Sequence, residues 1–442
     1  MQIQLSDHFS LKRLIRFTLP SVCMMVFTSI YLVIDGYFVS NFVGKGALAA
    51  VNMVYPIIMV ISSIGFMFGS GGSALVAATL GEGDEERARR NFTLLFLFPS
   101  AMAFAIAIPA YIFLPRILSF LGAEGQLLED SITYGRILLT TVFLFVVQME
   151  AQVFFVTAER PKLGLVNSIL GFGTNIILDG LFCAVFRWGI TGAAAATAIS
   201  QAIGGIIPLL YFSFAKGNRL HFTRTDFDYR AISKSAGNGL SELLSNISSS
   251  IVAMLFNGRL LYYAGEDGVA AYSVLMYVNM VFLSLFLGFS SGSGPLISFN
   301  YGSGNTKELK GLFHKLLIII LSSSVAMLAL SLTLSHPLSS LFVGYDRKLL
   351  EMTERGFGIY SFSFLFAGLN IFASSFFTAL NDGKVSAIIS FLRAFLFQVI
   401  SVLVLPYFLG IDGIWLSIVA TEVLTLFFSL YFLVTRKKDY DY

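Results

Sequence analysis

Apolar runs of about 20 residues recur along the whole chain, and they constrain its fold more than any other feature of the sequence. With 56% hydrophobic and 12% charged residues and a mean hydropathy of +0.79, the chain is far too apolar for a soluble protein. Continuous runs, rather than segments of about ten residues with alternating polarity, exclude an outer-membrane β-barrel. The sequence therefore predicts an all-α polytopic membrane protein.

The apolar runs predict twelve transmembrane helices. Their approximate ranges are 14–39, 48–79, 92–114, 131–157, 163–186, 190–214, 235–263, 269–299, 311–333, 356–380, 385–408 and 413–434. An even number of spans places both termini on one side of the membrane. Twenty lysines and arginines fall on segments of that side and eight on the opposite segments. Because basic residues accumulate in cytoplasmic segments, both termini are predicted to be cytoplasmic.

The two halves of the chain repeat each other. Residues 264–313 align without a gap with residues 43–92 at an offset of 221, and the segment that begins at Gly410 matches the one that begins at Gly189 at the same offset. Two six-helix lobes of the same orientation with a site between them are typical of secondary transporters. The predicted domains are an N-terminal lobe (1–214), a cytoplasmic linker (215–234) and a C-terminal lobe (235–442).

Four polar residues lie at a similar depth in three predicted helices of the first lobe, namely Asp35, Asn175, Asp179 and Thr197. An ionisable group inside a membrane helix is costly, and its default interpretation is an ion or substrate site. All four positions at the 221-residue offset are apolar, whereas a functional site needs to exist only once. The alternative for Asp35 is a hydrated residue near a helix end. We predict that the four residues bind a cation or share a proton.

Two further acids, Glu150 in the fourth predicted span and Glu242 in the seventh, could meet a cationic substrate in a central cavity. The alternative for each is a carboxylate that packs between helices and is hydrogen-bonded to its neighbours. Methionines could line an adaptable apolar pocket beside them. The candidates for the substrate cavity are Glu150, Glu242, Gln148, Met149, Asn246 and Met280.

Other intramembrane residues favour structural roles. Arg393 and Glu422 lie at compatible depths in the last two spans, which favours a buried ion pair. Pro20 removes a backbone hydrogen bond from the first span, which predicts a hinge in the helix that carries Asp35. The glycines of residues 69–72 lie inside the second span, where close helix packing explains them better than phosphate binding. The sequence has no GxxxxGK[ST] motif and no nucleophile–base pair or metal cluster, so we predict no ATPase, no other enzyme activity and no cofactor.

The chain resembles the multidrug and toxic compound extrusion (MATE) family, in the branch of MepA-like and DinF-like bacterial proteins. The resemblance covers essentially the whole chain and rests on the two six-helix lobes, the glycine-rich end of the second span and Asp35 in an Ile-Asp-Gly sequence. In members with the same set, residues at the positions of Asp35, Asn175, Asp179 and Thr197 form the first-lobe site for protons or sodium.

The resemblance extends to three further positions. Pro20 matches the position at which the first span of such relatives bends. Glu242 is similar to the span-7 acid that other members use in a second-lobe site. Asn370 stands roughly where those members carry a carboxylate, so the resemblance does not imply a second-lobe sodium site.

The expected function is a secondary antiporter in the bacterial inner (plasma) membrane. It would export amphipathic, mostly cationic organic compounds in exchange for protons or sodium. Its partners would be these substrates and the lipid bilayer, with no nucleic acid, and a monomer would suffice because the pathway runs between lobes of one chain. The alternative is a lipid-linked saccharide flippase of a related two-lobe family, which would need a cavity rich in arginine and lysine, whereas only Arg393 lies inside a span.

Overall fold

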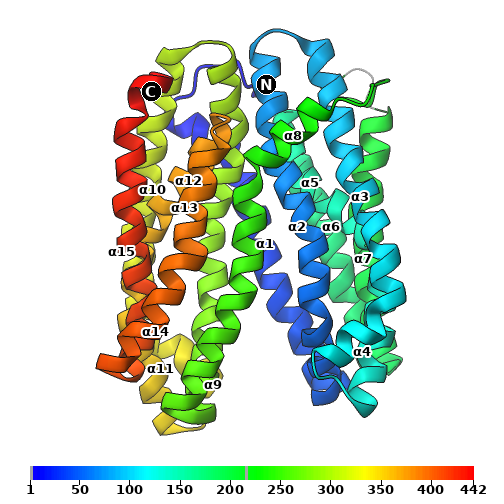
Figure 1. Ribbon diagram of the computed structural model, residues 1–442, viewed down its shortest axis with the longest axis vertical. Coiled ribbons are helices and arrows are strands. Elements are labelled where there is room, and N and C mark those ends of the chain that lie inside the picture. Colours follow the sequence, from blue (N-terminus) through cyan, green and yellow to red (C-terminus); the bar gives the residue numbers. More distant parts are fainter. Residues whose placement is uncertain (1–2, 215–217) are drawn as a thin grey trace.

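The computed structural model describes residues 3–214 and 218–442, and it is built almost entirely of helices (Figure 1). Residues 215–217 of the predicted linker lie outside the described residues. The helices of the first half are α1 (Leu11–Phe38), the π-helix η1 (Val39–Val43), α2 (Lys45–Gly81), α3 (Glu85–Phe120), α4 (Gly125–Leu139), α5 (Val142–Thr157), α6 (Pro161–Asp179), the π-helix η2 (Gly180–Val185) and α7 (Gly189–Phe214).

The second half begins with the short amphipathic helix α8 and then follows the same plan. Its helices are α8 (Tyr229–Asn238), α9 (Leu240–Gly302), α10 (Thr306–Val343), α11 (Arg347–Tyr360), the 3-10 turn η3 (Ser361–Ser363), α12 (Phe364–Ala379), α13 (Gly383–Phe391), the π-helix η4 (Leu392–Leu396), α14 (Phe397–Leu409), α15 (Ile411–Thr435) and α16 (Lys437–Tyr440). The placement of the lobe boundary at residues 215–234 stays a prediction.

The twelve predicted spans agree with these helices. Within the described residues, ten helices are long and apolar enough to cross a membrane, and α4 with α5, bent by 56° at their junction, gives an eleventh. Helix α9 has 63 residues, or about 95 Å at 1.5 Å per residue, which is far more than one crossing needs. Its backbone leaves helical geometry at Gly265 (φ 63°, ψ −151°), where the chain reverses (Figure 1). Dividing α9 at that residue gives twelve spans.

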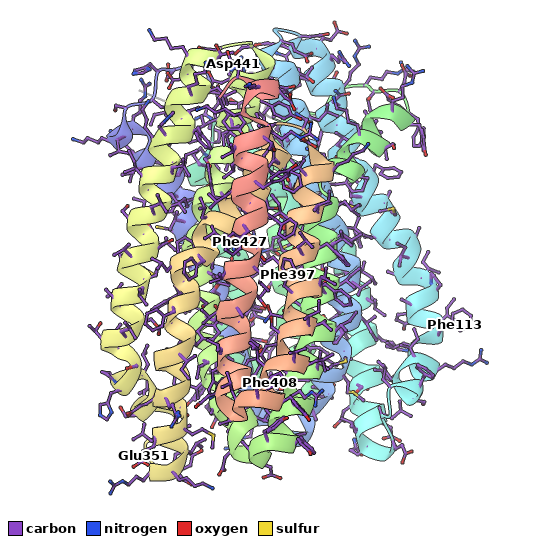
Figure 2. The ribbon with its side chains drawn as sticks, turned by 60° about the vertical axis from the view of Figure 1, so that its left-hand side comes forward. Phe113, Glu351, Phe397, Phe408, Phe427 and Asp441 are labelled. Carbon is purple, nitrogen blue, oxygen red and sulfur yellow. The ribbon has the colours of Figure 1, made fainter. Side chains whose placement is uncertain are left out.

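The surface of the helical bundle is that of a multi-pass membrane protein. Large apolar side chains such as Phe113, Phe408 and Phe427 project outwards, and all three are 47% exposed or more (Figure 2). Charged residues such as Glu351 and Asp441 lie near opposite ends of the bundle (Figure 2). An apolar side chain on this surface meets lipid instead of water, so its exposure carries no hydrophobic penalty.

The internal repeat is visible in the local geometry. Asp84 accepts a hydrogen bond from the backbone N–H of Arg87 at the start of α3, and Asn305 accepts one from Glu308 at the start of α10. Such a cap satisfies a donor that the helix itself leaves unpaired. Glycines with positive φ also recur at the 221-residue offset, and the pairs are Gly44 and Gly265, Gly83 and Gly304, and Gly189 and Gly410. The repeat therefore reflects equivalent turns and caps.

The two lobes touch through glycines that obey the same repeat. A Cβ added to Gly81 would lie 2.1 Å from the backbone oxygen of Phe299, and a Cβ added to Gly302 would lie 2.1 Å from that of Ala78. Gly81 and Gly302 are related by the offset of 221, and so are Ala78 and Phe299, so each contact is the repeat-related image of the other. Helix α2 and the second half of α9 therefore meet across a pseudo-two-fold axis. These positions exclude any side chain larger than hydrogen, because the opposing helix backbone occupies the space.

The lobes diverge away from the end of the bundle that carries both termini, which we call the terminal end (Figure 1). One large cluster of buried apolar side chains takes in both lobes there, with Phe92 of the first half and Phe376 of the second among its members. Beyond it, each lobe has its own cluster, around Val54 in the first and Trp415 in the second. Shared packing therefore closes the molecule at the terminal end only.

The N-terminal segment ties the two lobes together at this end. The backbone N–H of Leu5 donates to Glu159 of the first lobe, and the N–H of Phe9 donates to Glu308 of the second, both at 2.9 Å. His8 also contacts Glu308 at 2.6 Å. Leu5 and Phe9 are themselves fully buried, so this short segment contributes both apolar packing and charge-assisted hydrogen bonds to the closure.

Candidate functional site

Asp35 and Asp179 meet inside the N-terminal lobe. Asp35 lies in the last turn of α1 and Asp179 is the last residue of α6, which packs against α1. Their carboxyl groups are in hydrogen-bonding contact with each other. Asp179 is fully buried and Asp35 is half-buried. Two ionised carboxylates in contact repel strongly, so a shared proton or a cation between them would stabilise the arrangement.

Both acids stand beside π-helical segments. The π-helix η1 begins four residues after Asp35, and η2 begins directly after Asp179. Short π-helical turns within α-helices are rare and are frequent at functional sites, because the extra residue widens the turn and redirects side chains. The segments η1 and η2 also contact each other. The two helices that carry the acids therefore change geometry together at this point.

Asn175 and Thr197 complete the group of four that the sequence singled out. In the amide orientation that satisfies all its partners, Asn175 donates to Asp179 Oδ2 at 2.8 Å and accepts from the backbone N–H of Thr197 at 3.1 Å. The side chain of Asn175 is fully buried and Thr197 is 8% exposed. The remaining oxygen of Asp179 has no donor in the described part of the chain. A proton on the pair or a bound cation would satisfy it.

Two tyrosines at this site were not singled out from the sequence. Tyr134, on α4, lies beside Thr197, and the residue is 5% exposed. Tyr31 lies one turn before Asp35 on α1 and stacks on Phe172 of α6, with ring centroids 4.6 Å apart. Tyr31 could have been found from the sequence, because four residues before Asp35 it shares a face of the same helix. Tyr134 gives no such signal, because it meets Thr197 only when α4 and α7 pack together.

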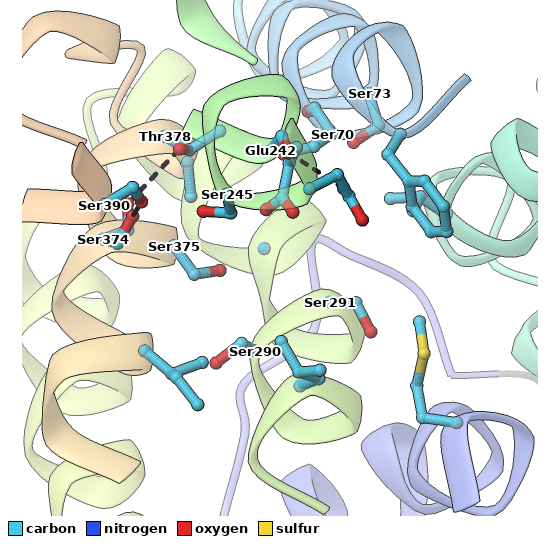
Figure 3. A pocket seen from close by; sticks show the side chains of 18 of the residues that line it. Ser70, Ser73, Glu242, Ser245, Ser290, Ser291, Ser374, Ser375, Thr378 and Ser390 are labelled. Atoms are coloured by element: carbon cyan, nitrogen blue, oxygen red, sulfur yellow. Dashed lines mark hydrogen bonds between the residues drawn. The ribbon is translucent and has the colours of Figure 1, made fainter. Parts of the chain in front are cut away.

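A cavity of about 380 Å³ lies between the lobes. Its wall includes Ser70 and Ser73 of α2 and Glu242, Ser245 and Ser291 of α9 (Figure 3). Thirteen of its lining residues are serines or threonines and one, Phe66, is aromatic. The volume is within the range of small-molecule sites in proteins. The residues that line the cavity do not include the acid pair or its partners Asn175 and Thr197, so the two sites are separate.

The predicted substrate residues divide into two groups. Glu242 and Asn246 line the cavity. Gln148, Met149 and Glu150 lie buried in the first lobe and do not reach it in this structure. Gln148 lies against Gly171 and Gly204, and Glu150 lies against Gly69.

Met280 also lies outside the lining residues. Substrate contact by Gln148, Met149, Glu150 and Met280 stays a prediction that the present arrangement does not support.

The glycine-rich segment of residues 69–72 packs against neighbouring helices. Gly71 lies against the backbone of Gly239, which confirms that these glycines serve close helix packing.

The second lobe holds a buried polar network in place of a second acid pair. The guanidinium of Arg393, in η4, bonds to Glu422 of α15 at 2.8 Å, which confirms the ion pair predicted from the sequence. Asn370 donates to Glu422 at 2.8 Å, and Ser429 donates to Asn370 at the same distance. Glu422 is 5% exposed. The network satisfies its own charges, and Arg393 and Asn370 also line the central cavity.

These observations define the class of the protein: a polytopic helical membrane protein whose two similar lobes enclose a central cavity and whose first lobe carries a buried acid pair. The MatE family model matches residues 20–181 and 241–404, which together make up most of the chain. The chain belongs to the MatE family.

Curated relatives and solved structures agree with this assignment. The chain is 24% identical over 429 residues to the multidrug export protein MepA of Staphylococcus haemolyticus, which covers 95% of this chain and 92% of that protein. It is 21% identical to MepA of Staphylococcus aureus over 93% of this chain and 91% of that protein. The crystal structure of a MATE protein in complex with MaL6 superimposes with a TM-score of 0.92 at 22% identity, covering 99% of this chain and 98% of the other. A MOP superfamily transporter from Pyrococcus furiosus gives a TM-score of 0.91 at 21% identity over 99% and 98% of the chains.

Proposed function

We propose that this protein is a secondary antiporter that exports cationic, amphipathic organic compounds in exchange for protons or sodium. The observation that carries the proposal is the buried contact between Asp35 and Asp179 in one lobe of a pseudo-symmetric pair. Packing alone does not require two acids there, because the repeat-related positions are Phe256 and Ile400. Two relatives are named multidrug export proteins, which supports export as the direction of transport and a broad range of substrates.

Helix α1 is the physical link between the ion site and the cavity. It carries Asp35 near one end, and Met25, Thr28 and Ser29 of the same helix line the cavity. Ser29 lies six positions before Asp35, which corresponds to about 9 Å along the helix axis. A change of charge at Asp35 therefore acts on the helix that touches the substrate. Coupling requires only that the ion and the substrate prefer different arrangements of this helix.

Pro20 gives α1 a place to bend. The helix runs through Pro20 without a break in this structure, so the hinge stays a prediction. The proline lacks the N–H that would bond one turn back, which lowers the cost of bending at that point. In the proposed cycle, protonation of the acid pair from outside removes charge, α1 bends at Pro20, and the wall that holds the substrate changes shape.

The distribution of basic residues supports an orientation with both termini in the cytoplasm. With the terminal end in the cytoplasm of a bacterial cell and the protein in the plasma membrane, the closed end faces inwards and the cavity lies on the outer side of that closure. This is the arrangement expected for release of an exported compound. One chain contains both lobes, the ion site and the cavity, which supports a functional monomer.

The coupling ion would be a proton or sodium, with no other cofactor. The carboxyl oxygens of Asp35 and Asp179, the amide oxygen of Asn175 and the hydroxyl of Thr197 are hard oxygen ligands that suit sodium equally well. A flippase for lipid-linked saccharides is the less supported alternative, because the one arginine in the cavity wall is already paired with Glu422.

The first prediction tests this function directly. In energised vesicles, wild-type protein should move a fluorescent lipophilic cation, and Asp35→Asn and Asp179→Asn should reduce that transport at least about tenfold because the shared proton or cation is lost. The proton and sodium gradients are collapsed separately to identify the ion. Asp130→Asn is the matched control and should transport normally, because among the described residues the carboxylate of Asp130 bonds only to the exposed amide of Gln126 on its own helix α4. Full transport by both site variants would refute the proposal.

A further inference from the structure

More than half of the hydroxyl groups in the wall of the central cavity have already used their hydrogen within their own helix. Seven of its thirteen hydroxyl side chains donate to a backbone carbonyl of their own helix, as in Ser29 to Met25 O at 3.1 Å and Ser249 to Ser245 O at 2.8 Å. A hydroxyl has one hydrogen and two lone pairs. Once that hydrogen is used within the helix, only the lone pairs remain to meet a ligand. One N–H of the Asn246 amide is also bonded to the backbone oxygen of Glu242 at 2.9 Å, which leaves its second N–H and its amide oxygen for other partners.

The wall carries one unpaired charge, and it is negative. Glu242 lines the cavity among serines of both lobes, and no described side chain forms an ion pair or hydrogen bond with its carboxylate (Figure 3). The other charged residue of the wall, Arg393, is neutralised by Glu422 at 2.8 Å. The cavity therefore favours a cation, and the carboxylate of Glu242 is its counter-charge.

Aromatic groups contribute little to this wall. Phe66 is the one aromatic residue among those that line it. Quaternary ammonium groups have no N–H and are recognised mainly by the faces of several aromatic rings. A cation without donors would leave the hydroxyl and carboxylate oxygens of this cavity without hydrogen bonds, which costs binding free energy. A protonated amine has two or three N–H donors and satisfies them.

From this geometry we infer that the cavity selects protonated primary and secondary amines, particularly those that also carry hydroxyl groups, over quaternary ammonium compounds. The ammonium group binds Glu242, and its remaining donors and those of neighbouring hydroxyls bind serine oxygens of both lobes, such as Ser291 and Ser249. The inference rests on the proposed export function and narrows its substrates from cations in general to cations that donate hydrogen bonds.

The test compares two dyes that share one skeleton and differ in the head group. Dansyl cadaverine presents a primary ammonium, and its N,N,N-trimethyl derivative presents a quaternary ammonium on the same skeleton. Isothermal titration calorimetry on the purified full-length protein in detergent gives the dissociation constant of each, and proteoliposomes give their transport. The amine should bind at least about tenfold more tightly than the quaternary form.

Substitutions separate the contribution of Glu242 to the amine preference from that of the serines. Glu242→Gln should weaken amine binding and bring the two dissociation constants close together. Ser249→Ala combined with Ser291→Ala should reduce the preference while leaving Glu242 in place, which covers the case in which Glu242→Gln fails to fold. Ser273→Ala is the control, because Ser273 is exposed, bonds to Val269 O in its own helix and does not line the cavity.

The outcomes distinguish this inference from the proposed function. Equal binding of both dyes by wild-type protein, or a preference that survives in both sets of variants, overturns the inference and leaves export intact if either dye is transported. Transport of neither dye, with the binding preference present, overturns the export function and with it the assignment of amines as exported substrates.

Discussion

At the scale of single residues, two of the buried glutamates, Glu422 and Glu150, differ in their surroundings. Glu422 is held by Arg393 and Asn370. Glu150 is fully buried, and both of its carboxylate oxygens lack a partner among the described residues. A buried charge is stable only when paired and hydrogen-bonded, so Glu422 contributes through its network, whereas Glu150 must be neutral to be tolerated.

These surroundings predict opposite effects for the same substitution. Glu422→Gln should lower the stability by about 2–3 kcal/mol, because it leaves the guanidinium of Arg393 without a counter-charge inside the membrane. Glu150→Gln should change the stability little or raise it, because no bond is lost. The thermal unfolding midpoint of each variant in detergent, followed by circular dichroism, measures the difference. A larger loss for Glu150→Gln than for Glu422→Gln would contradict this account.

At the scale of helices, glycines set the distance between neighbours in the first lobe. A Cβ at Gly205 of α7 would lie 2.4 Å from the backbone oxygen of Leu144 in α5, so these two helices are in backbone contact. A Cβ added to Gly173 of α6 would have no neighbouring atom within 4 Å. The first glycine is required by packing, whereas the second only adds flexibility to its helix.

This contrast predicts the result of a matched pair of substitutions. Gly205→Ala should destabilise the protein by about 1–3 kcal/mol, because the two backbones must separate to admit a methyl group. Gly173→Ala should be neutral or stabilise by up to about 1 kcal/mol, because alanine favours the helix. Thermal unfolding in detergent compares the two variants. If both shifted the midpoint equally, backbone contact between α5 and α7 would not be the cause.

At the scale of the whole molecule, closure at the terminal end depends on two small surfaces related by the internal repeat. Gly81 meets Phe299, and Gly302 meets Ala78, in the same way. The hydrogen bonds of the N-terminal segment to Glu159 and Glu308 reinforce that closure. The energy that separates the closed arrangement from one open at the terminal end therefore includes these repeat-related contacts as well as the apolar packing that both lobes share there.

Enlarging these glycines should open the terminal end. Gly81→Ala or Gly302→Ala should cost the closed state about 1–3 kcal/mol, which shifts its population about tenfold or more. Spin labels at Glu86 and Lys307, on exposed first turns of α3 and α10, report the distance between lobes after Cys23 and Cys183 are replaced. Both variants should populate longer distances than the wild type. Gly358→Ala, in open space on α11, is the control, and unchanged distances in both test variants would refute the account.

Much of this architecture follows from the sequence alone. The length of each apolar run determines that a helix crosses the membrane, and the offset of 221 residues determines that the second lobe repeats the caps and turns of the first. The ion pair of Arg393 and Glu422 was also predictable, because depth in adjacent antiparallel helices can be counted along the chain. These are local or periodic properties, so they survive without knowledge of packing.

The tertiary structure alone decided which polar residues face each other. Glu150 and Glu242 were equal candidates for the cavity in the sequence, and rotation about their helix axes places one against Gly69 and the other in the wall. The contact of Asp35 with Asp179 and the contribution of Tyr134 likewise depend on how four helices pack. Periodicity identifies the residues that share a face of a helix, but the neighbour of that face is determined by close packing between segments far apart in the chain.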